Sequence, residues 1–252
     1  MRRLLLCALG LLLAAAPCGA AAADTLPPLA ATPPAIAINS LYNGMDLTVA
    51  GKVPAGSQVV VRLAGEPTTF HMKEKGKVFG ILWMNREKVA FSDAPKVFLE
   101  AASEGVAPET AARYGVPGLA ERIKAETSDP DKAALVAEFL KFQQAEKLYR
   151  DSAGQVTLAP EADGQTPFSA VLHVPSRLSP GTYSVEALAI KDGAVVARGQ
   201  TAIAASFVGA PAFLADMAFG HATLYGVLAS VIAILGGLVI SRIFQGSKSG
   251  AH

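Results

Sequence analysis

Cysteine is nearly absent from this 252-residue chain, and its only two examples, Cys7 and Cys18, fall within the first 20 residues. Both lie in a segment that reads as a signal peptide, so we expect the mature chain to have no thiol. A protein without disulfides depends on its hydrophobic core, and this chain is long enough to build one. The absence also excludes thiol catalysis, thiolate metal sites and haem attachment through cysteine.

Other residue types that perform chemistry are few or scattered. The four histidines are His71, His173, His221 and His252, and no two of them have the spacing of a metal-binding pair. The sequence has no phosphate loop ending in Lys-Ser or Lys-Thr and no Gly-x-Ser-x-Gly elbow. We therefore expect no cofactor, no metal and no enzymatic activity. An enzyme would need titratable groups that converge in one cleft.

Acidic residues are missing from the C-terminal part, where none follows Asp216. The segment from Ala222 to Ile240 has no charge at all, and its helical length of roughly 28 Å matches the hydrocarbon core of a bilayer. Arg242 and Lys248 follow it, which predicts a cytoplasmic C-terminus. Residues 24–221 contain 18 Lys and Arg against 21 Asp and Glu, a net charge near −3. This balance gives no reason to expect nucleic acid as a partner.

The N-terminus has the features of an export signal. Arg2 and Arg3 precede an apolar run, and Ala21 to Ala23 offer a small-residue cleavage site. An uncleaved anchor and a lipoprotein at Cys18 are the alternatives, and Pro17 disfavours the second. The two ends together predict a single-pass protein of the bacterial inner membrane, with its N-terminal domain in the periplasm.

The region between the two ends favours β-structure. Short apolar or alternating runs recur with turn residues between them, which is typical of an antiparallel, immunoglobulin-like β-sandwich. Asp192-Gly193 is the strongest hairpin signal. The predicted order is a signal peptide (1–23), a Pro/Ala-rich leader (24–35), a periplasmic sandwich (36–206) with a helical insert at about 108–152, a membrane-proximal segment (207–221), a transmembrane helix (222–244) and a cytoplasmic tail (245–252).

The insert is predicted to contain two helices. A short one is expected over residues 118–126. A longer one is expected to start at Asp129 as N-cap with Pro130 at its first position, and to end near Arg150, where Glu146 can pair with that arginine. Spacings of three and four place one apolar face on Leu135, Phe139, Phe142, Ala145 and Tyr149.

Residues 78–91, VFGILWMNREKVAF, contain the only tryptophan. We expect a strand through Met84, a turn at Asn85-Arg86-Glu87 and a second strand after it. Both faces of the first strand are apolar. Either the helical insert covers the outer face, or Trp83, Asn85 and Arg86 form an edge that binds a partner, because aromatic and arginine side chains anchor interfaces.

Small residues recur along the predicted span. Ala229, Ala233 and Gly237 share one helix face, and Ala222, Gly226 and Ser230 share another. Such faces allow a second helix to approach closely, so the partner would be a second copy or another membrane protein. The alternative is that small residues are simply common in membrane helices.

A family resemblance follows from five segments taken together: GKVPAGSQVVVRLAGEP, KGKVFGILWMNREKVAF, EKLYRD, SPGTYSVEALAIKDGAVVA and LYGVLA. In this combination the chain resembles the alpha-proteobacterial transmembrane protein family from about Ile36 to Phe244. The resemblance implies the topology above and no defined activity. It also implies an association with permeases of the sulfite-exporter type.

Two function hypotheses follow. The first is a membrane-anchored periplasmic accessory protein, which contacts the bilayer and a membrane protein partner through its span and the surface around Trp83. The second is a solute-binding or sensing module with a pocket between the sandwich and the insert. A deep pocket lined by Arg62, Arg86 or Arg113 would favour an anionic ligand.

Overall fold

The computed structural model describes residues 24–78, 81–127 and 130–245. The predicted signal peptide, Asp129 and the last seven residues lie outside the described residues. The elements are β1 (Asp24–Thr25), β2 (Ala30–Thr32), β3 (Ala35–Ile38), β4 (Met45–Pro54), β5 (Gln58–Gly65), β6 (Pro67–Val78), β7 (Leu82–Pro95), β8 (Phe98–Ala102), α1 (Pro108–Tyr114), η1 (Pro117–Leu119), β9 (Lys124–Glu126), α2 (Lys132–Ala145), β10 (Tyr149–Arg150), β11 (Gly154–Leu158), β12 (Gln165–Val174), β13 (Gly181–Lys191), β14 (Ala194–Phe207), α3 (Ala210–Gly220) and α4 (Ala222–Gln245).

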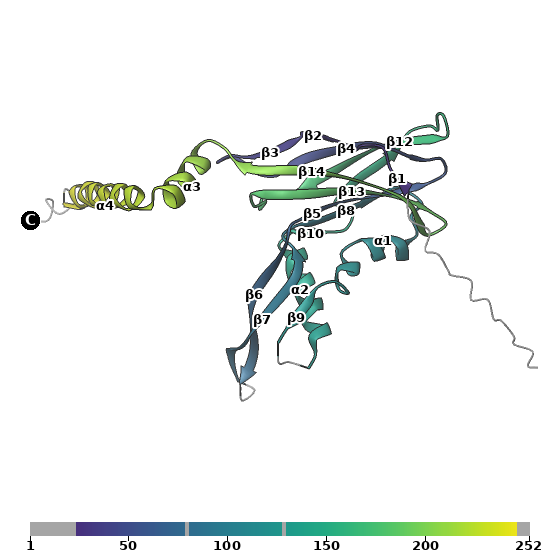
Figure 1. Cartoon of the computed structure of the whole chain (residues 1–252). Coiled ribbons are helices and arrows are strands. Elements are labelled where there is room, and N and C mark those ends of the chain that lie inside the picture. The colour runs from purple at the N-terminus through teal and green to yellow at the C-terminus, as the bar shows by residue number, and fades with distance from the viewer. Residues whose placement is uncertain (1–23, 79–80, 128–129, 246–252) are drawn as a thin grey trace, which may run out of the picture.

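Two sheets form a sandwich (Figure 1). The larger sheet has the order β1-β14-β13-β5-β8-β10, with β3 also paired to β14, and the smaller sheet has the order β11-β12-β4-β2. Asp192 and Gly193 join β13 to β14 with φ of 51° and 76°, so the predicted hairpin turn is confirmed. The mainly β fold with a helical insert and an apolar C-terminal helix is confirmed as well. The immunoglobulin-like topology stays a prediction.

The sandwich core follows from period-two alternation. Every second residue of β12 is buried, and the same alternation holds for most of β4, so Leu47, Val49, Ala170 and Leu172 face the larger sheet with no exposed surface. The Pro/Ala-rich segment at 24–35 contributes Leu26 and Leu29 to this core, at 6% and 8% exposure.

A second core lies outside the sandwich. Strands β6, β7 and β9 form a separate sheet, and α2 packs against it (Figure 1). Phe70, Phe91 and Phe139 meet there, together with Tyr149 from β10. The helical insert therefore covers an apolar face of the hairpin, as one of the two sequence interpretations expected, but it does so only at the base of the hairpin.

The turn predicted at Asn85-Arg86-Glu87 is wrong. These residues belong to β7, and the chain reverses between Val78 and Leu82, which pair with each other. The polar residues mark an irregularity instead: Lys73 pairs with Lys88, whereas Lys75 pairs with Asn85, so β7 has one residue more than β6 in this stretch. This β-bulge allows the polar residues to lie within the strand, so the strand does not end there.

The predicted helix bounds also need correction. The long helix begins at Lys132, and its N-cap is Asp131, whose side chain accepts a hydrogen bond from the Ala134 amide at 3.1 Å. It ends at Ala145, because Lys147 takes a positive φ of 59° and turns the chain into β10. Glu146 consequently pairs with Arg177 and not with Arg150.

The short helix predicted over residues 118–126 is not formed. Its place is taken by the single turn η1 and by β9, which pairs with β7 through Ala90, Phe91 and Ser92. The strand prevails because Ala125 pairs with Phe91 and joins the second core. A long-range pairing of this kind leaves no periodic signal in a three-residue segment.

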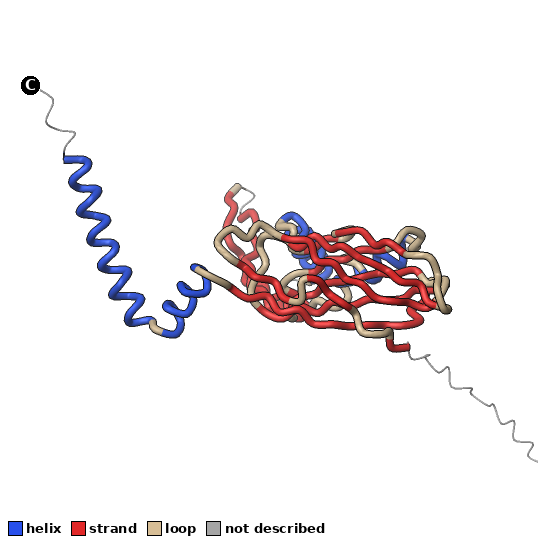
Figure 2. The backbone as a smooth tube through the Cα atoms, turned by 90° about the horizontal axis from the view of Figure 1, so that it is seen from above, coloured by secondary structure: helices blue, strands red, loops and turns tan. Residues whose placement is uncertain are grey.

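The C-terminal part leaves the sandwich as two helices. Helix α3 follows β14, and α4 is apolar over Ala222–Phe244, with none of its span buried against the rest of the described chain. Figure 2 shows both helices extending away from the sandwich. The length and composition of α4 match those of a membrane-spanning helix.

Candidate interaction site

A cavity lies between the β6–β7 hairpin and α2. It measures about 810 Å³ and is lined by three stretches: His71 to Lys73 of β6, Val89 and Phe91 of β7, and Leu135, Glu138, Phe139 and Phe142 of α2. We call it the hairpin groove. It opens to solvent, because Phe142 at its mouth is 47% exposed.

Phe91 and Phe139 line the hairpin groove and belong to an aromatic ladder that continues beneath it. The ring of Phe139 stacks on Phe91 with centroids 4.5 Å apart, and it also contacts Phe70 at 5.5 Å and Tyr149 at 6.1 Å. The Tyr149 hydroxyl donates to the Pro95 carbonyl at 2.6 Å, which fixes the base of the ladder. Phe91, Phe139 and Tyr149 are buried and Phe70 is half-buried, so a ligand would meet an apolar, aromatic surface.

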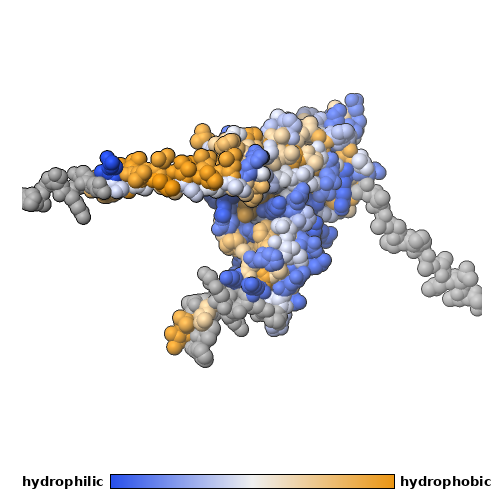
Figure 3. All heavy atoms as spheres, turned by 60° about the vertical axis from the view of Figure 1, so that its left-hand side comes forward, coloured by the Kyte–Doolittle hydropathy of each residue, from blue (hydrophilic) through white to orange (hydrophobic). Residues whose placement is uncertain are grey.

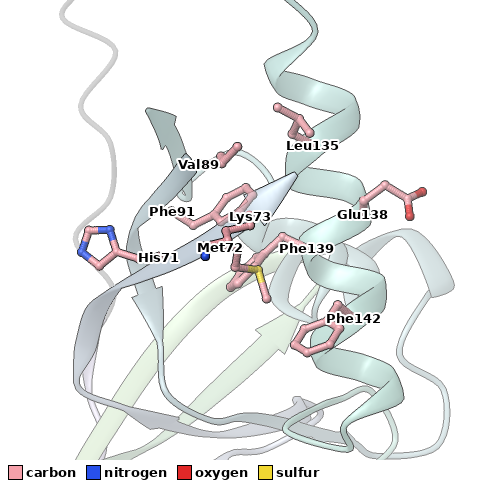
Figure 4. A pocket seen from close by; sticks show the side chains of 9 residues that line it. All are labelled: His71, Met72, Lys73, Val89, Phe91, Leu135, Glu138, Phe139 and Phe142. Carbon is pink, nitrogen blue, oxygen red and sulfur yellow. The ribbon is translucent and has the colours of Figure 1, made fainter. Parts of the chain in front are cut away.

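The polar side chains of the hairpin groove lie at its rim. Figure 4 shows Met72, Phe139 and Phe142 converging, while the His71 ring and the Glu138 carboxylate point away. Glu138 pairs with Lys141 at 2.7 Å on the outside of α2, where both side chains are 70% exposed. An occupant of the hairpin groove would therefore be recognised mainly by its apolar surface.

The sequence-predicted hairpin residues lie beyond this groove, toward the end of β7. Trp83 pairs with Lys77 and Asn85 with Lys75 along the backbone, while the side chains of Trp83, Asn85 and Arg86 lie outside the described residues. Their described neighbours are exposed: Ile81 at 88%, Leu82 at 59% and Met84 at 48%. We call Ile81, Leu82 and Met84 the tip patch, and Figure 3 shows an apolar end on the hairpin.

The other predicted contact residues lie on α4. The helical spacing of four places Ala229, Ala233 and Gly237 on one face of this helix, and nothing lies within 4 Å of a side-chain carbon built on Gly237. Figure 1 shows α4 well separated from the hairpin. The structure thus brings the two predicted groups to two separate surfaces, not to one site.

A row of charged residues crosses the outer face of the larger sheet, under the insert. Arg62 of β5 lies opposite Glu186 of β13 and Glu100 of β8 in the strand register. Its guanidinium pairs with Glu186, donates to the Tyr114 carbonyl at 3.4 Å and lies 5.8 Å from the Tyr114 ring centroid. The Val116 amide donates to Asp151 at 2.6 Å. These contacts fasten the α1–η1 segment to the sheet.

Burial shifts the acids of this row. It raises the pKa of the Glu100 carboxyl to about 6, although the Ser152 amide and the charge of Arg62 act in the opposite direction. Burial also raises the pKa of Asp151, against the hydrogen bond from Val116. Because Glu100 is only 2% exposed, a substrate does not reach its carboxyl group. We therefore interpret these charged residues as structural contacts that hold the α1–η1 segment against the larger sheet.

Of the arginines proposed as alternatives for an anion pocket, Arg62 lines a cavity and Arg113 is not among the residues that line it. Arg62 lines a cavity of about 210 Å³ with Arg122, but Asp93 and Glu186 line the same cavity. Arg113 is exposed on α1, and the side chain of Arg86 lies outside the described residues. Two acidic side chains thus oppose the two arginines that line this cavity.

Metal-ligating residues are dispersed over residues 24–78, 81–127 and 130–245. No group of three or more His, Cys, Asp or Glu in these ranges has an arrangement that could hold an ion. His173 pairs with Asp46 across β12 and β4 on the exposed side of the smaller sheet.

Sequence reasoning missed the hairpin groove. The helix face predicted from spacing included Phe142, but the buried face of α2 is Val136, Phe139, Leu140 and Gln143. This offset turns Phe142 toward the groove mouth. The alternation of Phe70 and Met72 along β6 was the only sequence signal for the wall opposite α2. That wall forms a groove only because α2 lies beside it.

The comparison with protein families gives a match over most of the chain. The family model described as Putative transmembrane protein (Alph_Pro_TM) matches residues 28–246. The chain belongs to this family. Membership in the Alph_Pro_TM family confirms the resemblance seen in the sequence, and together with α4 it identifies a single-pass membrane protein. No curated protein matches the chain.

Proposed function

We propose that this Alph_Pro_TM protein is a membrane-anchored accessory protein that binds a membrane protein through the hairpin groove. The observation that carries the proposal is Phe142, a large aromatic side chain left 47% exposed beside a buried aromatic ladder. The fold does not need this side chain for its core. Exposed aromatic residues at the mouth of apolar grooves are typical anchors for a partner.

The membrane anchor α4 determines which class of partner the groove can reach. Because α4 holds the chain in the bilayer, proteins embedded in the same membrane meet the groove at high local concentration. The small-residue face of Ala229, Ala233 and Gly237 provides a second contact for a helix of that partner. The partner class implied by the family resemblance is a permease of the sulfite-exporter type. The export signal supports a periplasmic domain at the bacterial inner membrane, with a cytoplasmic C-terminus.

A second function is favoured by the size of the groove. Its volume of about 810 Å³ lies within the usual range for small-molecule sites. The lining favours an apolar ligand, in contrast to the anion suggested by the three arginines. A solute-binding or sensing protein would use the same side chains but would need no protein partner.

Purification from native membranes separates the two functions. The full-length protein is isolated in mild detergent as the wild type, as Phe142→Glu and as the control Leu41→Glu. Leu41 is 90% exposed in the turn before β4, so the control adds the same charge away from the groove. We expect a stoichiometric membrane protein with the wild type and the control only. A partner retained equally by all three, or recovered with none, would contradict the proposal.

A further inference from the structure

The tip patch is too far along the hairpin to belong to the groove. The second core ends at Met72 and Val89, and the β6–β7 ladder continues beyond it through Gly76–Met84 to Val78–Leu82. Ile81, Leu82 and Met84 are exposed at the end of this ladder. In a free soluble domain such a projection promotes aggregation, so its persistence at the end of a regular hairpin calls for an apolar surface that covers it.

Positive charge lies farther along the same hairpin, where the ladder leaves the second core. Lys73 and Lys88 are paired across the ladder, and both are exposed. Like charges placed opposite each other repel, and an external negative surface would relieve that repulsion. The segment from His71 to Lys88 has five Lys and Arg against two Glu, although residues 24–221 as a whole are acidic. An apolar end with a basic collar matches the interface of an anionic lipid bilayer.

The bilayer is also the surface to which α4 anchors the chain. β14 ends at Phe207 and α4 begins at Ala222, and α3 occupies most of the interval. Helix α3 itself exposes Phe213 at 60% and Phe219 at 90%. The sandwich is therefore held close to the lipid surface by a short apolar link. Figure 1 shows α4 leaving one end of the sandwich and the hairpin projecting from the face of the larger sheet.

We propose that the tip patch inserts into the anionic lipid surface of the membrane that anchors the chain. The hairpin then forms a second membrane contact, and Lys73 and Lys88, which lie about 20 Å from the end of the hairpin, stay on the water side of the anionic headgroups that attract them. Two contacts fix the orientation of the sandwich relative to the bilayer, whereas α4 alone leaves it free to rotate about its link. The tip patch itself does not line the hairpin groove, and Lys73 is the one residue that both surfaces use.

The single tryptophan reports on the proposal directly. Trp83 lies between Leu82 and Met84, and it is the only tryptophan in the chain. The full-length protein is reconstituted into vesicles of phosphatidylcholine brominated on its acyl chains, with and without phosphatidylglycerol. We expect blue-shifted emission that is quenched by the brominated chains, and stronger quenching when phosphatidylglycerol is present. Emission typical of water, without bromine quenching in either vesicle, would overturn the proposal.

Variants separate lipid insertion from other ways of shielding the tryptophan. The double variant Ile81→Asp/Leu82→Asp is expected to lose the quenching, and Leu41→Asp to keep it. The variants Lys73→Gln and Lys88→Gln are each expected to lower the inserted fraction about fivefold in anionic vesicles. Phe142→Glu should leave the quenching unchanged, so failure of the groove proposal is distinguishable. Protection of Trp83 from acrylamide without bromine quenching would indicate a protein contact, such as a second copy, and would also overturn the proposal.

Discussion

Phe139 and Phe142 lie one helical turn apart on α2 and are expected to respond in opposite ways to truncation. Phe139 is 2% exposed and contacts three aromatic rings, whereas Phe142 is 47% exposed. Phe139→Ala removes a fully packed ring and is expected to lower the free energy of unfolding of the second core by about 4 kcal/mol. Phe142→Ala removes a half-buried ring and is expected to cost about 1 kcal/mol or less.

The destabilisation should stay local. The sandwich core and the second core share no fully buried residue, and the half-buried Leu148 is the described side chain that packs against both. Phe139→Ala is therefore expected to release α2 and the hairpin base while the sandwich stays folded. Urea unfolding of the full-length protein in mild detergent, followed by circular dichroism, measures the sandwich. Limited proteolysis across residues 103–152 measures the insert.

Two results would refute this reasoning. Equal destabilisation by the two substitutions would mean that the aromatic ladder does not hold the second core. Loss of the sandwich transition in Phe139→Ala, at the same urea concentration at which the insert becomes cleavable, would mean that the two cores unfold as one unit. In either case the second core that supports the hairpin groove would not be an independently stable unit.

Three further predictions test other parts of the structure. Burial places the pKa of Glu100 near 6, above its ordinary value near 4.5, so folding is opposed by ionisation as pH rises through this interval. Glu100→Gln should raise the free energy of unfolding by about 2 kcal/mol at pH 7 and by almost nothing at pH 4, measured by urea denaturation; an equal gain at both values would refute the assignment. Asp131→Ala removes the α2 N-cap and should cost about 1 kcal/mol in the same assay, while an unchanged midpoint would show that the cap contributes nothing. Replacement of Ala229, Ala233 and Gly237 by leucine should weaken association in detergent, and unchanged retention of the partner would argue against this helix face.

Local signals in the sequence were sufficient wherever one short segment decides the structure. Asp192-Gly193 required positive φ and gave the β13–β14 turn. The uncharged run from Ala222 was long enough to define α4 without any tertiary information. Alternation in β4 and β12 indicated the sandwich faces because each of these strands has one buried side.

Signals that depend on distant residues could not be read in the same way. Residues 124–126 are a strand only because Ala125 pairs with Phe91, far away in the chain. The polar run at Asn85 looked like a turn because an extra residue in a strand and a turn have similar composition. The groove needs α2 beside β6, and the exposure of Phe142 depends on a small rotation of that helix. The sequence composition therefore indicated the fold class and the membrane anchor. The candidate site could be recognised only from the packing of α2 against the hairpin.

Site-specific cross-linking in native membranes tests the central claim most directly. A photoreactive phenylalanine analogue replaces Phe142 in the full-length protein, and the same analogue at Leu41 serves as the control. The account predicts a cross-linked product of one defined mass, containing a membrane protein, from position 142 and none from position 41. Cross-links from both positions alike, or none from position 142 while the protein is folded and membrane-bound, would contradict a partner-binding groove.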